Sequence, residues 1–356
     1  MLVQWNMRLL GLIYSLLLLA PNLSWAWTTS KAKVGVYETA AYQSSNPKVF
    51  LKDTASHNQA QSEECYLFAF VTSLDVANRN GWNRRNVLGI SSEILFMQKM
   101  EEWAREVWTY QTGLDRGFYF DRGGDVHHAM KISVERGLYP ATVFRPRIPF
   151  IDWDFQGLYK DIRTITREEK IKIARAQNQE QFNFLFTNAM NRLRDRLGQE
   201  GQFLPSQFTI GSQTYTPQKF ENQVGVKRNS FIHYMYPQGR WDMGDPWDLR
   251  RALLEMVSAF NGQFRHGQTS WKRIWSYVVE SLNQGMPTMF SLKWAGVYHV
   301  LVATGYEYDA EGRLVSIKMK NSWGTDFGDQ GSAVFSPQDL QKSSSGVWGF
   351  TAPASF

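Results

Sequence analysis

The order of the predicted elements places this chain of 356 residues in the α+β class. Helix-like segments come first, and short segments that alternate as strands do come last, which favours separate helical and sheet parts over a regular βαβ alternation. Hydrophobic residues make up 43% of the chain and charged residues 20%, a composition typical of globular proteins. We therefore expect a helical part followed along the chain by a β-rich part.

Three helices are expected in the first half of the chain. The first is almost entirely apolar after Cys65, which predicts a buried helix with this cysteine in its first turn. Polar capping residues or glycines bound the other two. The three should run from Cys65 to about residue 80, from Ser91 to about Trp108, and from Asp125 to Gly137.

The second half is expected to begin with a middle region at residues 150–275 that is mainly helical. Within it, residues 166–197 are charged and favour helix, residues 201–236 are rich in turns, and residues 248–260 resemble another helix. The carboxy-terminal part, residues 276–356, alternates in short segments separated by glycine and acidic turns. Strands are expected there at residues 287–292, 299–308, 316–320 and 332–335.

The amino-terminal segment has the layout of a secretory signal peptide. Arg8 precedes an apolar run at residues 9–20, and the small-residue site Ser24-Trp25-Ala26 follows. The run is shorter than the about 20 apolar residues that span a bilayer. We expect residues 1–26 to be a signal peptide, and the mature protein to be secreted or periplasmic without stable membrane insertion. Residues 27–60 should form an extended arm.

The charges and motifs argue against several other classes of function. The net charge is +6, but basic and acidic residues are interspersed, as is typical of solvated helix faces, so we expect no nucleic-acid partner. Neither a pair of cysteines nor a His-x-x-x-His motif offers a zinc site. The turn at residues 328–331 lacks the lysine and helix of a phosphate loop. We expect no metal and no other cofactor.

Cys65 is the only cysteine, so an exported form of this chain has no internal disulfide. A single thiol in an oxidising compartment is either buried and inert or has a chemical role. A helix amino terminus lowers a thiol pKa through its dipole and its free N–H groups, and a nearby imidazolium lowers it further. Cys65 is therefore a candidate nucleophile.

His299 is the best candidate for its base among six histidines. It stands at the start of a predicted strand, where rigid backbone holds the side chain. Asn321 begins an Asn-Ser-Trp-Gly block beyond the next strand, and its amide oxygen can orient an imidazole as a carboxylate does in a serine triad. Trp323 in the same block is placed to shield this pair. Gln59, with Gln61 as a competing candidate, can donate to an oxyanion beside the Cys65 N–H.

Four elements of the sequence occur together in this order: Gln59, Cys65-Tyr66-Leu67-Phe68-Ala69, His299, and Asn321-Ser322-Trp323-Gly324. In combination they resemble papain-type cysteine peptidases. The stretch at residues 215–221 and the Leu-Phe after Cys65 resemble the bleomycin hydrolase and aminopeptidase C branch. The spacing from Cys65 to His299 also exceeds the about 130–150 residues of simple papain-type enzymes, and the excess falls in the middle region.

The resemblance implies a papain-like fold of two lobes. A helical lobe at about residues 55–150 would carry Cys65, a β-rich lobe at about 276–356 would carry His299 and Asn321, and a helical region would be inserted between them. Gly123 and Gly124 resemble the glycine pair that lines the family's substrate cleft. The chain departs from the family beside the nucleophile, where Glu63 and Glu64 replace small residues.

These two carboxylates should oppose ionisation of the thiol. Glu64 is expected to contact substrate together with Gly123, Gly124 and Trp323, and the acidic pair would narrow the primary subsite or favour a basic group there. The resemblance implies an exported cysteine peptidase that hydrolyses peptide or protein substrates through a Cys65 thioester. A catalytically silent papain-like binding protein and an acyltransferase using the same residues are the alternatives. Endopeptidase and aminopeptidase action stay open, as does the oligomeric state.

Overall fold

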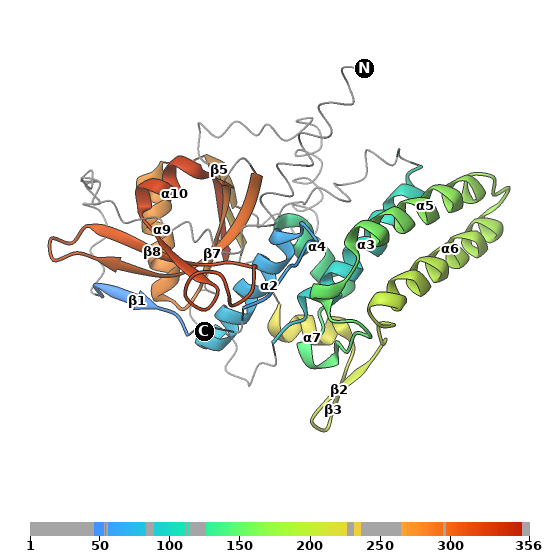
Figure 1. The fold of residues 1–356 in the computed structure, drawn as a ribbon, viewed down its shortest axis with the longest axis horizontal. Helices are drawn as coiled ribbons and strands as arrows, with labels where there is room; N and C mark the ends of the chain where they lie inside the picture. Colours follow the sequence, from blue (N-terminus) through green and yellow to red (C-terminus); the bar gives the residue numbers. More distant parts are fainter. Residues whose placement is uncertain are drawn as a thin grey trace, which may run out of the picture. The chain divides into compact units, whose positions relative to one another are not determined.

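Most helices precede most strands of the main sheet along the described chain, which confirms the α+β prediction (Figure 1). The structure is a computed structural model, and its described residues fall within one unit, Thr39–Phe356. The expected signal peptide, the glycine pair Gly123 and Gly124, and the expected helix at residues 248–260 lie outside the described residues. Those that are described are residues 46–350 except 53, 55, 83–88, 112, 114–125, 226–230, 236–264, 269 and 295–296.

The helical part is built around α2, Cys65–Ala77, whose 13 residues are all buried. A helix that is apolar on every side needs partners on every side. Helices α3 (Ser92–Thr109) and α4 (Val126–Arg136) pack against α2, and so do strands β6 (Thr288–Trp294) and β7 (Val297–Tyr308). The helix passes into a short π-helical segment, Asn78–Trp82, close to the predicted end. The apolar run after Cys65 was therefore a correct indication of a buried central helix.

The charged stretch at residues 166–197 is not one helix. It comprises the end of α5 (Phe155–Ile173) and most of α6 (Gln179–Glu200), which lie side by side (Figure 1). Asn178 begins α6 by accepting a hydrogen bond from the Gln181 N–H at 2.9 Å, as an N-cap residue does. Both helices pack on α3. Among the described residues, no helix is long and apolar enough to cross a membrane.

A small hairpin and a short helix return the chain from α6 to the helical part. Strands β2 (Phe208–Ile210) and β3 (Gln213–Tyr215) pair with each other, and α7 (Pro217–Val224) packs on α4. Gly137 makes the close approach possible. Its φ is +78°, and a Cβ at this position would lie 2.3 Å from the carbonyl carbon of Pro217.

The β-rich part is an eight-stranded sheet whose main path has the order β5-β4-β10-β6-β7-β8-β9, with β1 paired to β7. Neighbours are antiparallel except β4 and β5. The four expected carboxy-terminal strands are present. The strand bounds are β1 Lys48–Phe50, β4 Phe231–Met235, β5 Arg265–Gln268, β6 Thr288–Trp294, β7 Val297–Tyr308, β8 Leu314–Lys320, β9 Ser332–Phe335 and β10 Ser344–Phe350.

Strand β7 lies between two hydrophobic cores. Val300 and Val302 belong to the core of the helical part, whereas Leu301 and Ala303 belong to a second core on the other face of the strand. The helix α9, Trp271–Asn283, contributes to the second core and α10, Pro337–Ser343, closes it. Successive side chains of a strand point to opposite faces, and both faces of β7 are covered by a hydrophobic core, so successive residues of the run are apolar.

Several elements differ from the sequence-based expectation. Helix α9 and strand β10 were not predicted. Strands β4 and β5 join the main sheet although they fall inside the middle region that was expected to be mainly helical. Strand β1 belongs to the expected extended arm and pairs with β7.

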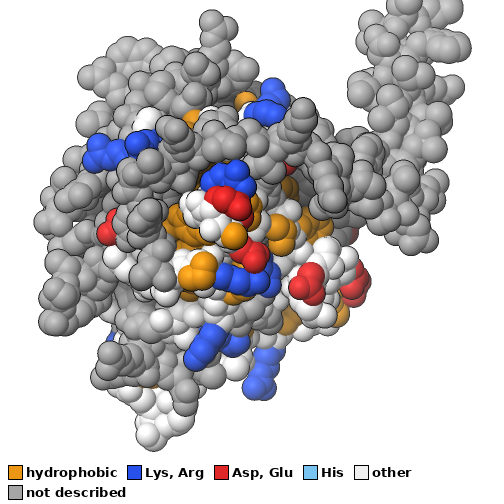
Figure 2. Space-filling view, turned by 90° about the vertical axis from the view of Figure 1, so that its left-hand side faces the viewer, with side chains coloured by type: hydrophobic (Ala, Val, Ile, Leu, Met, Phe, Trp, Pro, Cys, Tyr) orange, Lys and Arg blue, Asp and Glu red, His pale blue; other side chains and the backbone are white. Residues whose placement is uncertain are grey.

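On the face in Figure 2, basic, acidic and hydrophobic side chains are interspersed among the described residues.

Replacing Gly137 should separate steric overlap from the cost of a left-handed backbone. We expect Gly137→Ala to lower the free energy of unfolding by about 2–4 kcal/mol. The added methyl group would overlap the Pro217 backbone, and alanine would also have to adopt an unfavourable positive φ. Gly211→Ala is the matched control, with φ +58° and nothing within 4 Å of the added Cβ. It should cost about 1 kcal/mol. Equal losses in urea unfolding would contradict the close contact.

Candidate active site

A short antiparallel pairing joins the segment before α2 to the segment after β8. Asn58 forms a β-bridge with Trp323, and the Gln59 N–H donates to the Ser322 carbonyl at 2.8 Å. The Gly324 N–H donates to the His57 carbonyl at 3.1 Å. These contacts join the entrance to the cysteine-bearing helix to the Asn-Ser-Trp-Gly block, which is more than 260 residues away in the chain.

His57 fastens this pairing to the helical part. Its Nε2 lies 3.3 Å from Oδ2 of Asp75 on α2, and its Nδ1 lies 3.1 Å from Oγ of Ser92 on α3. Burial lowers the pKa of His57, but the hydrogen bond to Asp75 and that residue's charge outweigh it, so the pKa is raised overall. The imidazole of His57 therefore takes up a proton more readily than that of a free histidine, because the Asp75 carboxylate stabilises the protonated form.

His299 and Asn321 are in direct contact, and the contact determines the tautomer of the imidazole. The Ser322 N–H donates to Oδ1 of Asn321 at 2.7 Å, which identifies that atom as the amide oxygen. The same oxygen lies 2.7 Å from Nε2 of His299. Because an oxygen can only accept here, Nε2 must carry the proton. The lone pair of the neutral ring is thereby left on Nδ1, the nitrogen that can act as a base.

Trp323 covers the imidazole. Its ring centroid lies 4.9 Å from that of His299, with the planes at 36°, and the edge of Phe327 packs against it at 5.5 Å. Trp323 itself is 43% exposed, whereas His299 is only 4% exposed. The indole thus shields the histidine from water and keeps one of its own faces toward solvent.

Gln59 is oriented by Ser322. The Ser322 hydroxyl donates a short hydrogen bond to Oε1 of Gln59, so the amide nitrogen is directed away from Ser322 and can donate elsewhere. Gln59 is 7% exposed, so its side chain sits at the edge of the interior. Ser322 therefore contacts both amide side chains of the site, donating from its N–H to Asn321 and from its hydroxyl to Gln59.

Cys65 begins α2 and faces β7. The backbone N–H groups of Val300, the residue after His299, of Tyr66 and of Cys65 itself each lower the pKa of the thiol, so they lie near its sulfur. The N-cap residue Glu64 makes no side-chain capping bond, so the first N–H groups of the helix are not occupied by a side chain. The sequence-predicted nucleophile and the strand that carries the predicted base are therefore adjacent.

The protonation state of the site differs from the expectation for a helix amino terminus. Burial raises the pKa of the Cys65 thiol to about 12, with the Glu64 charge adding to it, and the three N–H groups lower it by less. Burial likewise lowers the pKa of His299 to about 4, against the opposing hydrogen bond to Asn321. At neutral pH the free protein therefore holds a neutral thiol and a neutral imidazole, because desolvation outweighs the helix N–H groups.

Glu64 is not placed to contact substrate, and that expectation is corrected. The residue is 0% exposed, and its carboxylate forms a buried ion pair with Lys99 of α3, itself 5% exposed. Burial raises the pKa of Glu64 although the Lys99 charge lowers it. Glu63 beside it points outward and has φ +57°, a left-handed conformation that costs a non-glycine residue about 1–2 kcal/mol.

Two residues that sequence reasoning did not select have positions as central as those it did. Ser322 orients both amides, and its place between Asn321 and Trp323 in the motif is a signal that was present in the sequence. His57 was considered only as one of six histidines, because nothing in its local sequence points to Asp75 and Ser92. The glycine pair that was expected to line the cleft lies outside the described residues.

The two neighbouring glutamates should respond in opposite ways to substitution. Glu64→Gln should lower the free energy of unfolding by about 3–5 kcal/mol, because it leaves the buried Lys99 ammonium without a counter-charge. Removing both charges in Glu64→Gln with Lys99→Met should recover most of that loss. Glu63→Gly should be neutral or stabilising by up to about 1 kcal/mol, because glycine relieves the positive φ. Equal destabilisation by both single changes in denaturant unfolding would contradict these positions.

Comparison with known proteins supports the fold. No family model matches the chain, and no curated protein sequence matches it. PepW from Lactobacillus rhamnosis HN001 is similar over 87% of this chain and 83% of its own, at 16% identity and a TM-score of 0.62. Xylellain, a cysteine protease from Xylella fastidiosa, is similar over 90% of both chains, at 14% identity and a TM-score of 0.44.

A third solved structure, the proform of the ragweed pollen cysteine protease Amb a 11, covers 89% of this chain and 68% of its own, at 13% identity and a TM-score of 0.37. Sequence identities this low speak for the fold and not for the activity. The mixed architecture, with a buried cysteine-bearing helix against the main sheet, agrees with the similarity to PepW. The chain has the papain-like cysteine peptidase fold.

Proposed function

We propose that this protein is a cysteine peptidase that hydrolyses peptide bonds through a thioester on Cys65. The observation that carries the proposal is the Asn321–His299 hydrogen bond, which leaves Nδ1 as the basic nitrogen of the imidazole. The next residue after His299, Val300, has its backbone N–H near the Cys65 sulfur. A structural histidine has no need of a defined tautomer beside the chain's only thiol. An acyl-transfer site requires both.

The proposed reaction proceeds in two steps. Nδ1 of His299 takes the thiol proton as the sulfur attacks the peptide carbonyl, and the same proton is then passed to the departing amine as the C–N bond breaks. Water next attacks the thioester, His299 takes a proton from it, and the thiol is regenerated as the acid leaves. Since both groups are neutral in the free protein, proton transfer accompanies attack and no ion pair precedes it.

Gln59 and the backbone of Cys65 are proposed to stabilise the oxyanion. The amide nitrogen of Gln59 is directed away from Ser322, and the Cys65 N–H belongs to the first turn of α2, where helix N–H groups have no intrahelical partner. Donors fixed before the reaction need no reorganisation when the charge develops. Trp323 would exclude water from the imidazole and border the bound substrate.

Two finer features are part of the proposal. Export, with residues 1–26 as a signal peptide, follows from the amino-terminal sequence pattern. Membership of the bleomycin hydrolase branch follows from the stretch at residues 215–221, which forms the end of β3 and the start of α7, and from the extra residues between Cys65 and His299. A papain-like binding protein without turnover is the second candidate, and the buried neutral thiol is the observation that favours it.

Active-site labelling separates the two candidates. A peptidyl epoxide directed at papain-type thiolates should add one adduct to Cys65 in the intact mass spectrum, and His299→Ala should slow labelling by at least about a hundredfold, the lower range for a general base. Because Cys65 is the only cysteine, the adduct has a single destination. Circular dichroism should show that His299→Ala folds. Equal slow labelling of both proteins would favour the binding protein.

Removal of the Gln59 amide should reduce turnover without abolishing it. We expect Gln59→Ala to lower kcat by about 10²–10³ and to change KM little, since the donor acts on the charge that forms during attack. The measurement is steady-state cleavage of a fluorogenic peptide. Gln61→Ala is the matched control, because Gln61 is exposed and was the competing candidate. A larger loss from Gln61→Ala would exchange their roles.

The pH dependence of thiol reactivity should reveal the neutral pair. The pKa of Cys65 is raised to about 12, so its thiolate fraction rises about tenfold per pH unit below that value. The rate of alkylation by iodoacetamide in the free protein should therefore keep rising from pH 6 to pH 9. A plateau that begins near pH 5 would instead indicate a thiolate–imidazolium pair at rest.

A further inference from the structure

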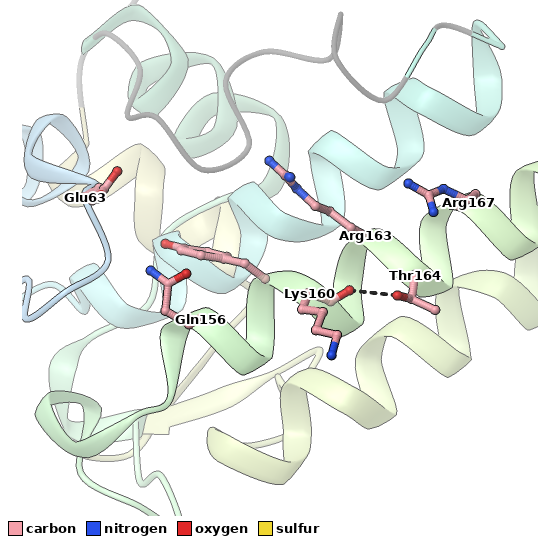
Figure 3. A pocket seen from close by; sticks show the side chains of 7 residues that line it. Glu63, Gln156, Lys160, Arg163, Thr164 and Arg167 are labelled. Carbon is pink, nitrogen blue, oxygen red and sulfur yellow. Dashed lines mark hydrogen bonds between the residues drawn. The ribbon is translucent and has the colours of Figure 1, made fainter. Parts of the chain in front are cut away.

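A solvent-facing cavity of about 490 Å³ lies beside the nucleophile loop. One wall is helix α5 and the other end is Glu63 (Figure 3). Gln156, Lys160, Arg163, Thr164 and Arg167 contribute exposed side chains along a single face of the helix. These positions recur at intervals of three and four residues, the spacing that aligns side chains on one side of an α-helix.

The cavity is physically joined to the candidate active site. Glu63 precedes Cys65 by two residues, so their Cα atoms are at most about 7.6 Å apart. Tyr159, which is 6% exposed and lines the cavity, donates a hydrogen bond from its hydroxyl to the Ser62 carbonyl at 2.5 Å. Helix α5 is therefore held against residues 62–64, the segment that leads into Cys65. The cavity, called the groove from here on, begins at Glu63 of that segment.

The cavity-lining face of α5 is basic. Lys160, Arg163 and Arg167 succeed one another along it, over a rise of about 10 Å at 1.5 Å per residue. Glu63 is the only acidic residue among the side chains that line this cavity. The charge thus changes from negative beside the nucleophile to positive along the helix.

Several cations elsewhere on the hairpin formed by α5 and α6 have carboxylate partners. Lys172 pairs with Glu169 at 2.7 Å, and Arg192 pairs with Glu168 at 2.6 Å. By contrast, neither Lys160 nor Arg167 has an ion pair with any residue that the structure describes. Lys160 and Arg167 therefore keep their charges available on the wall of the cavity, where a ligand can meet them.

We propose that this groove is a substrate subsite that binds an acidic stretch of polypeptide, with Lys160, Arg163 and Arg167 as specificity-determining residues. The proposal rests on the peptidase function for its meaning in catalysis. An extended peptide advances about 3.3 Å per residue, so a chain whose scissile carbonyl is at Cys65 passes Glu63 within about two residues and reaches the basic face within the next few. Acidic side chains at these positions would meet the three cations in turn.

A polypeptide fits the charge pattern better than a nucleic acid. A nucleic acid carries a negative charge on every nucleotide, so it would place a phosphate against Glu63 as it approached the nucleophile. A peptide can place a neutral or basic residue there and acidic residues beyond it. The sign change along the groove therefore selects a ligand whose charge varies along its length.

Direct binding tests the subsite without requiring turnover. Two fluorescein-labelled ten-residue peptides, identical except that three alternate Glu residues are replaced by Gln, would be titrated into the full chain carrying Cys65→Ala. Fluorescence anisotropy should give a Kd about tenfold lower for the Glu peptide at low salt, and a smaller difference at 0.5 M NaCl. Equal Kd values for the two peptides would overturn the proposal.

Charge reversal locates the site. Lys160→Glu with Arg167→Glu should abolish the preference for the Glu peptide. Lys272→Glu with Arg273→Glu is the matched control, because it reverses two exposed charges on α9 outside the cavity lining and should leave the preference intact. A preference lost equally in both, or retained in both, would contradict a specific groove. Competition by a single-stranded oligonucleotide at the same concentration as the Glu peptide would reassign the groove to a general polyanion.

The outcome is independent of the outcome for the peptidase. If Cys65 fails to react with the peptidyl epoxide while the charge-dependent binding holds, the groove belongs to a binding protein and only the peptidase proposal fails. If Cys65 reacts and fluorogenic peptides are cleaved, kcat/KM for Glu and Gln substrates should differ about tenfold in the parent protein. That difference should disappear in the Lys160→Glu, Arg167→Glu protein.

Discussion

The antiparallel hydrogen bonds between residues 57–59 and residues 322–324 are the contact on which the candidate site depends. They place Gln59 beside Ser322, and Ser322 in turn orients the Asn321 amide that determines the His299 tautomer. His57, held by Asp75 and Ser92, anchors the same pairing to α2 and α3. Without it, the cysteine-bearing helix α2 and the Asn-Ser-Trp-Gly block would be connected mainly through apolar packing, which sets distance but not hydrogen-bond direction.

Desolvation controls the electrostatics of this region. Cys65 and His299 are both buried, and burial favours the neutral form of each, so the helix N–H groups do not produce a resting ion pair. Two other buried pairs behave differently. Glu64 and Lys99 combine opposite charges, and the Asp75 carboxylate raises the pKa of His57, so attraction between partners opposes the cost of burial. The candidate site therefore contains a neutral thiol and a neutral imidazole beside two buried pairs in which a carboxylate faces a basic group.

Helices α5 and α6 connect the packing of the helical part with the proposed basic groove. Helices α5 and α6 pack on α3, and the tyrosine that seals α5 against the nucleophile loop also lines the basic groove. A change in the tilt of α5 would therefore move the groove and the loop together.

Much of the architecture could be predicted from local patterns. The apolar run after Cys65 indicates a helix buried on all sides, and short strand-like segments bounded by glycine and acidic turns located β7 and β8. Helix α9 was missed although Trp271, Ile274 and Trp275 begin a regular amphipathic pattern behind the N-cap Ser270, so that signal was available. Strands β4 and β10 could not be located in this way, because they pair with each other across more than 100 residues.

The sequence by itself determined which chemical groups are present: one thiol, an imidazole at a strand start, and an Asn-Ser-Trp-Gly block, because side-chain chemistry does not depend on the fold. Only the tertiary structure decided what each group can do. It buried Glu64 against Lys99 and left Glu63 at the mouth of a basic groove, a difference that two adjacent identical residues cannot reveal. It also set the proton positions, because pKa values depend on burial and on neighbours that are distant in the chain.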